Sequence, residues 1–569
     1  MESTVGNDKL YPFFLILIHA ACLIALKEKK VSGEEVLSPK QISDLDADFI
    51  IGGLFPVHIS EKNTSKCEYG KDQRYRYMSP GLGEKLCYRI NLSGLMWIEA
   101  MLFAINEINN SSDILAGKKL GYVINDSGNS AQIALNATLD YIYNTEQVVN
   151  SSANETCSCT KPGRKITALI GGAGSKISRT VSYILGVDNI PQISYSSTSP
   201  SLSNKLYFPS FLRTIPSDLM QAEVMADLVA YYNWTYVSTI ATDEDYGRFG
   251  IQAFKKAIKS RNICISVDEL FHSDIRLPET KTKISEIVRK LKKDQAAKVV
   301  VLFSELPSAL AVIEEAQRLG LKGKTWIGTE AWGDKSDVLP FNEDIVGGML
   351  GVLPWKGNIE NFERHMASLT PLNTSHNPWF LDYWKGYFGC NFEEEDNDET
   401  STSSSNKTLL DSNNSQLTLA EARTFSGSDK TSEPKVICTT KSLKQDGSPS
   451  VLEKMTNNKD QKTITCSKCI HGNIPTAAEL QLNKSPNVMD AVYSVALALN
   501  KMLNCKDPNG LLKDGKCPAI QNGTKVIPNE LLTYIKNLSY VQNLGYPVEF
   551  DRHGDTKGKI DKKLTTFIM

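Results

Sequence analysis

The sequence lacks any concentrated run of lysine or arginine, and beyond its first 26 residues it lacks an apolar run long enough to cross a membrane. Its formal net charge is −2 and its pI is near 6.4. Binding to nucleic acid or to an anionic membrane requires clustered positive charge, and a spanning helix requires about 20 apolar residues. These absences argue against both classes of protein, and small ligands or other proteins are the expected partners.

Catalytic motifs are also missing. The sequence contains no H-E-x-x-H and no G-x-S-x-G, and its seven histidines form no cluster with metal-ligand spacing. The segment GGAGSK at 171–176 fails the phosphate-loop pattern because Ile177 follows its lysine. Cys466 and Cys469 form a C-x-x-C, but without a second pair a local disulfide explains them better than zinc or redox chemistry. We therefore predict that the protein is not an enzyme and has no metal or cofactor of its own.

What the chain does contain is enough apolar sequence for several cores. It has 569 residues, of which 41% are hydrophobic and 22% charged, and this length allows three or four units. An apolar run at Tyr11–Leu26 precedes a charged cluster at Lys27–Lys30, which is typical of a signal peptide of residues 1–26. Glu2 and Asp8 are unusual in such a segment, and they leave an uncleaved signal anchor as the alternative.

Glycosylation signals and cysteines agree with a secreted or extracellular glycoprotein. Of the twelve cysteines, removal of Cys22 with the signal leaves an odd number, so at least one thiol is free or pairs with another chain. Sequons of the form Asn-x-Ser/Thr occur at Asn63, Asn91, Asn109, Asn110, Asn125, Asn136, Asn150, Asn154, Asn233, Asn373, Asn406, Asn413, Asn483, Asn522 and Asn537.

Short apolar runs alternate with helical patterns, which predicts an α/β fold with mainly parallel sheets. The expected strands are Gly121–Ile124, Ile166–Ile170, Ile190–Ser194, Tyr236–Ile240, Val299–Phe303 and, later, Tyr546–Phe550. The expected helices include Asn487–Leu503, one whose apolar stripe is Met101, Ala104, Ile105 and Ile108, and one that begins near Asp218 with the stripe Val224, Leu228 and Tyr232. Residues 393–460 are polar and poor in aromatics, so we expect a flexible insertion there.

The glycine turn at 171–174 comes between a strand and a helix. A helix N-terminus in that position presents free backbone N–H groups to an anion such as a carboxylate. A tight turn without any ligand is an equally good interpretation of the residues alone.

Four segments together resemble the Venus-flytrap domain of class C G-protein-coupled receptors, in its calcium-sensing receptor branch, with similarity also to metabotropic glutamate receptors. They are IPQISYSSTSPSL at Ile190–Leu202, FLRTIPSD at Phe211–Asp218, DEDYGRFG at Asp243–Gly250 and EAW at Glu330–Trp332. The resemblance extends from about residue 50 to about residue 555. It implies a two-lobed fold of the type I periplasmic-binding-protein kind that closes on an amino acid, with lobe 1 at 48–216 and 350–552 and lobe 2 at 217–349.

The same resemblance implies a binding site for an L-α-amino acid between the lobes. Ser175, on the glycine turn, would hold the α-carboxylate, Thr198 would serve both charged groups, and the backbone at Ser196 would form the lobe 1 edge. Across the cleft, Asp218 and Glu330 would hold the α-ammonium and Tyr246 would cover it. Taken singly, each residue is as typical of a surface or a helix cap.

The pocket for the ligand side chain is implied less fully. Trp97 matches an aromatic at the cleft mouth, but Ser93 stands where relatives carry arginine, which weakens a glutamate interpretation. Lys484 matches a lysine that glutamate receptors use for the distal carboxylate, so an acidic ligand stays open, but a solvated loop lysine is the interpretation we favour. Sequons at Asn91 and Asn483 border these positions.

Cysteine pairing follows from the same resemblance. Cys390 with Cys438 and Cys505 with Cys517 match family disulfides, and Cys157 and Cys159 match a loop that links two protomers. Gly128 stands where the usual partner of Cys87 would be, so we expect Cys87 to pair with Cys67. Cys264 matches a residue that reaches the cysteine-rich domain, and it is the candidate for the odd thiol.

After Phe550–Asp555 (FDRHGD), the sequence contains neither the cysteine-rich nor the seven-helix region of that family. We expect residues 553–569 to be a truncated tail and lobe 2 to lack its last strands. The leading hypothesis is a homodimeric amino-acid sensor, modulated by calcium. The alternative is a secreted decoy or dimerisation partner of a full-length class C receptor with a degenerate cleft, and an enzyme ranks third.

Overall fold

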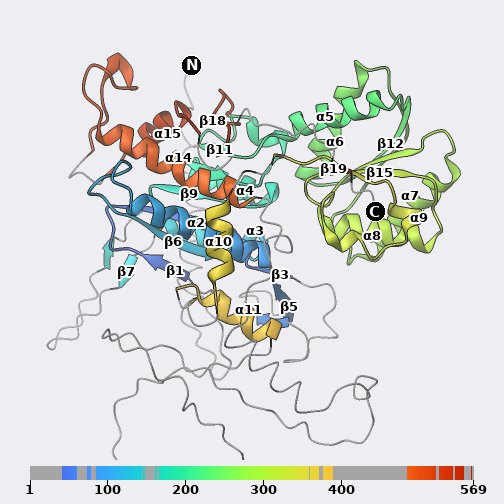
Figure 1. Ribbon diagram of the computed structural model, residues 1–569, viewed down its shortest axis with the longest axis horizontal. Coiled ribbons are helices and arrows are strands. Elements are labelled where there is room, and N and C mark those ends of the chain that lie inside the picture. Colours follow the sequence, from blue (N-terminus) through green and yellow to red (C-terminus); the bar gives the residue numbers. More distant parts are fainter. Residues whose placement is uncertain are drawn as a thin grey trace, which may run out of the picture.

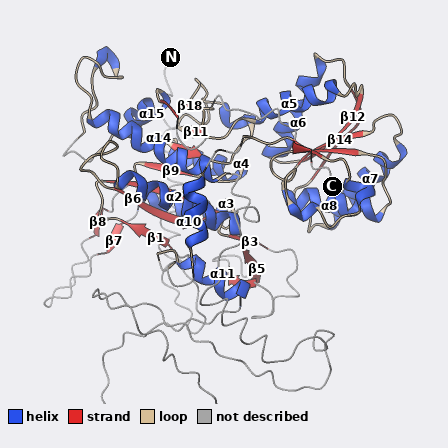
Figure 2. Cartoon of the chain, in the orientation of Figure 1, coloured by secondary structure: helices blue, strands red, loops and turns tan. Residues whose placement is uncertain are grey.

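A computed structural model describes residues 41–60, 74–78, 85–143, 145–147, 160–162, 166–388 without 356, 358, 371–373 and 375, then 484–520, 525–541, 545–556 and 565–566. Two six-stranded sheets, each with helices on both faces, form two bodies that lie side by side (Figures 1 and 2). The predicted two-lobed α/β class with mainly parallel sheets is confirmed.

Several predictions fall outside the described residues. They are the signal peptide 1–26, the insertion 393–460, the cysteines Cys67, Cys157, Cys159, Cys390, Cys438, Cys466 and Cys469, and the sequons at Asn63, Asn150, Asn154, Asn373, Asn406, Asn413, Asn483 and Asn522.

The first sheet has the order β1 (Gln41–Asp44), β6 (Leu120–Asp126), β2 (Phe49–Phe55), β9 (Ala168–Ile170), β10 (Gln192–Ser194) and β11 (Phe211–Arg213). All neighbours are parallel except β1, which runs antiparallel to β6. Every residue of β2 is buried, because its alternating side chains face two different cores. Phe49 and Ile51 pack with α2 (Leu92–Asn109), α14 (Ser485–Leu503) and α15 (Pro528–Lys536), whereas Ile50 and Leu54 pack with α3 (Ala131–Tyr143) and α4 (Ser175–Leu185).

The second sheet has the order β13 (Cys264–Phe271), β12 (Tyr236–Thr242), β14 (Val299–Phe303), β15 (Thr325–Gly328), β16 (Leu350–Gly351) and β19 (Thr565–Thr566). Its strands are parallel up to β16. The side chains of β14 alternate between one core that includes α5 (Asp218–Tyr231) and α6 (Asp245–Lys259) and another that includes α7 (Pro278–Lys293), α8 (Leu306–Arg318) and α9 (Glu343–Val346). β19 pairs antiparallel with β16, so the segment expected to be a bare tail contributes an edge strand to this sheet.

Smaller elements complete the described part of the chain. They are the sheet of β3 (His58–Ser60), β5 (Lys85–Ile90) and β4 (Arg74–Met78), the pairs β7 (Thr145–Gln147) with β8 (Thr160–Pro162) and β17 (Ser539–Val541) with β18 (Pro547–Glu549), the helices α10 (Glu360–Ser368) and α11 (Pro378–Phe388), and short 3-10 turns at Pro200–Ser203, Ser336–Val338 and Lys513–Gly515.

Every strand and helix predicted from the sequence has a counterpart in the structure, but the buried stripe of α5 was predicted only in part. Leu228 is buried as expected and Val224 is partly buried against the same core, whereas Tyr232, just after the helix, is 43% exposed. The helix also buries Ala222, Met225, Ala226 and Val229. Both sets have helical spacing, and α5 packs on α6 as well as on the sheet, so a wider face than the predicted stripe is buried.

Cys505 and Cys517 form the expected disulfide, and Cys264 is exposed and has no disulfide partner among the described cysteines, which agrees with its choice as the candidate odd thiol. The bridge closes a short loop, with a sequence separation of 12, after α14. Replacing both Cys505 and Cys517 with alanine should lower the free energy of unfolding by about 2–3 kcal/mol, because the reduced unfolded chain regains loop entropy. Urea unfolding measures this, with Cys264→Ser as the matched control, and equal stability of all three proteins would refute it.

No helix within the described ranges combines the length and the apolar character that crossing a bilayer requires.

Candidate functional site

The glycine turn leads from β9 into α4, as the sequence predicted. Gly171 has φ of +132°, and a Cβ there would lie 2.5 Å from the carbonyl oxygen of Leu54, so a side chain cannot be accommodated. Ser175 is the first residue of α4 and is buried. Its Oγ accepts a hydrogen bond of 3.2 Å from the backbone N–H of Ser199, which joins the turn to the next loop of the same sheet.

That loop follows β10 and is rich in serine. Serine hydroxyls satisfy backbone N–H groups of the loop and a backbone C=O group of the glycine turn that have no partner in the sheet. The Oγ of Ser194 accepts from the N–H groups of Ser196 and Ser197 at 3.3 and 2.9 Å, and it donates to the carbonyl of Gly172 at 2.8 Å. The carbonyl of Thr198 accepts from the N–H of Asp218 at 2.9 Å. The loop therefore links the glycine turn on one side to the start of α5 on the other.

Asp218 and Glu330 bring two carboxylates to the same place. Asp218 begins α5, where Ser217 is the N-cap, and only 1% of its surface is exposed. Glu330 follows β15 and accepts hydrogen bonds from the hydroxyls of Tyr246, at 3.1 and 3.2 Å, and of Thr198, at 3.4 Å. Neither carboxylate oxygen of Asp218 has a hydrogen-bond partner among the described residues.

The carboxyl group of Asp218 has an unusual pKa. Burial, and then the nearby charge of Glu330, raise the pKa of Asp218 well above its usual value, against the opposing effects of the nearby Thr198 hydroxyl and of the positive charges of Arg213 and Lys484. Burial also raises the pKa of Tyr246 and lowers the pKa of Lys484. A buried carboxylate without a hydrogen-bond donor is costly, and a cation placed beside it would remove that cost.

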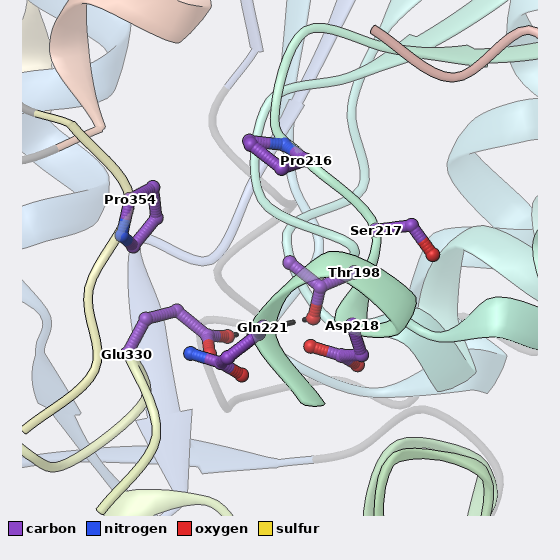
Figure 3. A pocket seen from close by; sticks show the side chains of 7 residues that line it. All are labelled: Thr198, Pro216, Ser217, Asp218, Gln221, Glu330 and Pro354. Carbon is purple, nitrogen blue, oxygen red and sulfur yellow. Dashed lines mark hydrogen bonds between the residues drawn. The ribbon is translucent and has the colours of Figure 1, made fainter. Parts of the chain in front are cut away.

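A pocket opens at this point, with about 210 Å³ of empty space including its open mouth. Its lining residues are Thr198, Pro216, Ser217, Asp218, Gln221, Glu330 and Pro354 (Figure 3). Sequence reasoning missed Gln221, although it lies one helical turn after Asp218 and so on the same face of α5. Its Nε2 donates to the carbonyl of Val352 at 2.7 Å, and its Oε1 has no partner within the described part of the chain.

The predicted site residues divide into three groups. Thr198, Asp218 and Glu330 line the pocket, and Tyr246 reaches it through Glu330. Ser175 and Ser196 do not line it: Ser175 begins α4 after the glycine turn, and Ser196 belongs to the serine loop that contains Thr198.

Lys484 and Trp97 lie outside the pocket lining. Lys484 is not a solvated loop lysine: it is the N-cap residue of α14, half-buried, and its Nζ donates to the Oγ of Ser196 at 2.8 Å. Trp97 packs against Tyr195, with ring centroids 5.1 Å apart, at the margin of the first core.

Contacts between the α4 and α6 regions accompany the pocket. Arg179 of α4 forms an ion pair with Asp245 of α6 at 2.5 Å, and the Oγ of Ser199 donates to the carbonyl of Asp245 at 3.2 Å. With the bond from Thr198 to Glu330, these contacts bring the two bodies together around Asp218. Among the described residues, no group of three or more histidine, cysteine or acidic side chains is arranged to hold a metal ion.

The sequence over most of this fold matches a known family. Residues 96–561 match the model of the receptor family ligand-binding region, so the chain belongs to that family, which is a class of sensing domains and not of enzymes. Within it, the chain is related to the ligand-binding region of class C receptors of the calcium-sensing kind. It is 33% identical over 522 residues to the extracellular calcium-sensing receptor of Sus scrofa and 32% identical over 522 residues to that of Homo sapiens. In both cases 91% of this chain is covered but only 43% of the relative, so the chain spans less than half the length of these receptors.

Proposed function

We propose that this chain binds an L-α-amino acid in the pocket around Asp218. The observation that carries the proposal is the buried carboxylate of Asp218, which has no hydrogen-bond partner in the described structure and lies beside a second carboxylate. A primary ammonium group supplies three donors and a positive charge, and it would satisfy both carboxylates at once.

The opposite end of the ligand would face the first sheet. The hydroxyl of Ser175 and the N-terminus of α4 offer donors to an α-carboxylate, and the hydroxyl of Thr198 would join them on leaving Glu330. The backbone at Ser196 would form the edge of the site on this side. The α-carboxylate of a bound amino acid would then contact residues that follow strands of the first sheet. Its α-ammonium group would contact residues of α5, α6 and the loop after β15. Because only a closed arrangement allows both sets of contacts, ligand binding would favour closure.

The test is a thermal-shift screen of the secreted protein with each L-amino acid, with and without millimolar calcium as a proposed modulator. Specific amino acids should raise the melting temperature in a dose-dependent way. The variant Ser175→Ala/Asp218→Ala should lose the response, since each residue supplies a charge-assisted contact of about 1.5–3 kcal/mol. Thr280→Ala, which removes a buried hydroxyl in α7, should retain it.

A cooperatively melting protein that responds to no amino acid would contradict the proposal. The role as a dimerising partner of a longer receptor would then be favoured, and non-reducing electrophoresis would test it through the proposed interchain bridges at Cys157 and Cys159.

We also propose that the chain enters the secretory pathway and is glycosylated. Asn136 and Asn233 are exposed, whereas Asn125 is 7% exposed and the Nδ2 of Asn109 donates to the carbonyl of Leu120 at 2.9 Å. Glycans should therefore occur at the first two sequons and not at the last two, because an attached sugar needs an accessible amide. Glycopeptide mass spectrometry of secreted protein measures this, and a glycan on Asn125 would show the expectation to be wrong.

A further inference from the structure

Arg213 is completely buried, yet it is not among the residues that line the proposed ligand pocket. It ends β11, at the edge of the first sheet, and it belongs to the FLRTIPSD segment. Its Nε donates to an oxygen of Asp555 at 2.8 Å, and its Nη2 donates to the Oγ of Ser203 at 2.6 Å. Its Nη1 donates to the carbonyls of Ser197 and Ser199 at 3.1 and 3.0 Å. All three guanidinium nitrogens therefore have acceptors.

Asp555 comes from the far end of the chain, 342 residues after Arg213. It lies in a tight turn in which the carboxylate of Asp551 accepts from the N–H groups of His553 and Asp555 at 2.7 and 3.0 Å. The carbonyl of Gly554 accepts from the N–H of Arg213 at 3.0 Å, and the second oxygen of Asp555 accepts from Ser203 at 2.7 Å. The hydrogen bonds of this turn thus hold Asp555 in the position from which it pairs with the guanidinium of Arg213.

The two carbonyls that Arg213 binds lie on either side of Thr198. Thr198 lines the pocket, and its own carbonyl accepts from the N–H of Asp218. One nitrogen of a rigid, planar group thereby fixes the loop just before and just after the pocket residue. Without Asp555, the guanidinium of Arg213 would lose its charged acceptor, and its orientation toward the two carbonyls would be less strongly fixed.

We infer that Arg213 and Asp555 are positioning residues for the ligand pocket, and that the segment Asp551–Asp555 sets the position of Thr198 from the opposite end of the chain. The inference deepens the proposed amino-acid function and rests on it for its binding measurement. The order of the loop itself can be measured without any ligand.

The first measurement is amide hydrogen exchange of the ligand-free protein. In Asp555→Asn, which keeps the side-chain volume and removes the charge, a peptide covering Ser196–Leu202 should exchange faster by about tenfold. A peptide covering β14 should not change. In Lys118→Gln, which breaks the 2.9 Å ion pair with Asp48 in the first sheet, neither peptide should change. Ser203→Ala keeps the ion pair and should give a smaller increase at Ser196–Leu202.

Unchanged exchange at Ser196–Leu202 would overturn the inference. Equal acceleration of both peptides would overturn it too, because the pair would then support only global stability.

The second measurement is the Kd of an amino acid found in the thermal screen. Asp555→Asn should raise it about tenfold, and it should add little in a Thr198→Val background, because both changes act on the same contact. Full additivity of the two changes would contradict a positioning role. If the unaltered protein binds no amino acid while the exchange result holds, the proposed function fails and the positioning of the loop stands.

Discussion

Replacing Asp218 with asparagine should stabilise the ligand-free protein and, at the same time, weaken amino-acid binding by about ten- to a hundredfold. The carboxylate is buried, has no partner in the described structure, and lies beside Glu330. Asparagine has nearly the same shape without the charge, so the free energy of unfolding should rise by about 1–2 kcal/mol. Binding should weaken because the charge-assisted contact with the ammonium is lost.

The stability gain has a pH dependence whose sign follows from the pKa of Asp218. Because burial and Glu330 raise this pKa in the folded protein, the unfolded chain releases its proton at lower pH than the folded protein does. The unaltered protein therefore loses stability as the pH rises from the unfolded pKa of Asp218 toward its folded pKa. The asparagine variant has no such loss, so its advantage should be larger near neutral pH than in acid.

Urea unfolding of the ligand-free proteins in acid and at neutral pH measures both effects. Asp48→Asn is the matched control, because Asp48 accepts from Lys118 at 2.9 Å and from the N–H of Lys119 at 2.8 Å, and its change should not stabilise the protein. If Asp218→Asn is less stable than the unaltered protein, the Asp218 carboxylate does not destabilise the ligand-free fold, and the argument that it needs a bound cation fails.

The sequence predicted the sheets well because strands buried on both faces are visible as continuous apolar runs. Val299–Phe303 and Gly121–Ile124 are such runs, and the structure places each of them between two neighbouring strands, not at the edge of its sheet. The glycine turn before Ser175 was also predictable, since a strand, glycines and a helix pattern follow each other directly. The buried face of α5 was predictable only in part: Leu228 is buried as expected, but the helix also packs against α6, and no local pattern indicated that contact.

Contacts between distant segments could not be read from local patterns. Arg213 and Asp555 are one example, and Glu99 of α2 is another, since it accepts hydrogen bonds from Asn377 at 2.9 Å and contacts His365 and His376 at 3.3 and 3.1 Å. Burial alone would raise the pKa of Glu99, but the hydrogen bonds from these side chains hold it at about 2. Nothing near Glu99 in the sequence indicates a buried ion, and the same is true of the half-buried Lys484.

Amino-acid binding should become tighter as the pH rises through the range in which ligand-free Asp218 is protonated. A bound ammonium favours the ionised form of Asp218, so binding should release a proton, and affinity should rise by up to about tenfold per pH unit in that range. The groups that face Asp218 are Glu330, which favours its protonation, and the Thr198 hydroxyl, Arg213 and Lys484, which oppose it. Tyr246 donates to Glu330 and stays protonated, because burial raises its pKa.

Calorimetry at about pH 5.5 and about pH 7.5, in buffers of different ionisation enthalpy, separates this proton from the heat of binding. Glu330→Gln should reduce the proton release on binding. Without the neighbouring negative charge the pKa of Asp218 is raised less, so a smaller fraction of ligand-free Asp218 carries a proton. Lys484→Gln is the informative control. The pKa of Lys484 is lowered by burial, and a lysine that took up a proton on binding would make affinity fall as pH rises, opposite to the effect of Asp218. Binding heats that are equal in the two buffers, with affinity independent of pH, would show that Asp218 is already ionised in the ligand-free pocket.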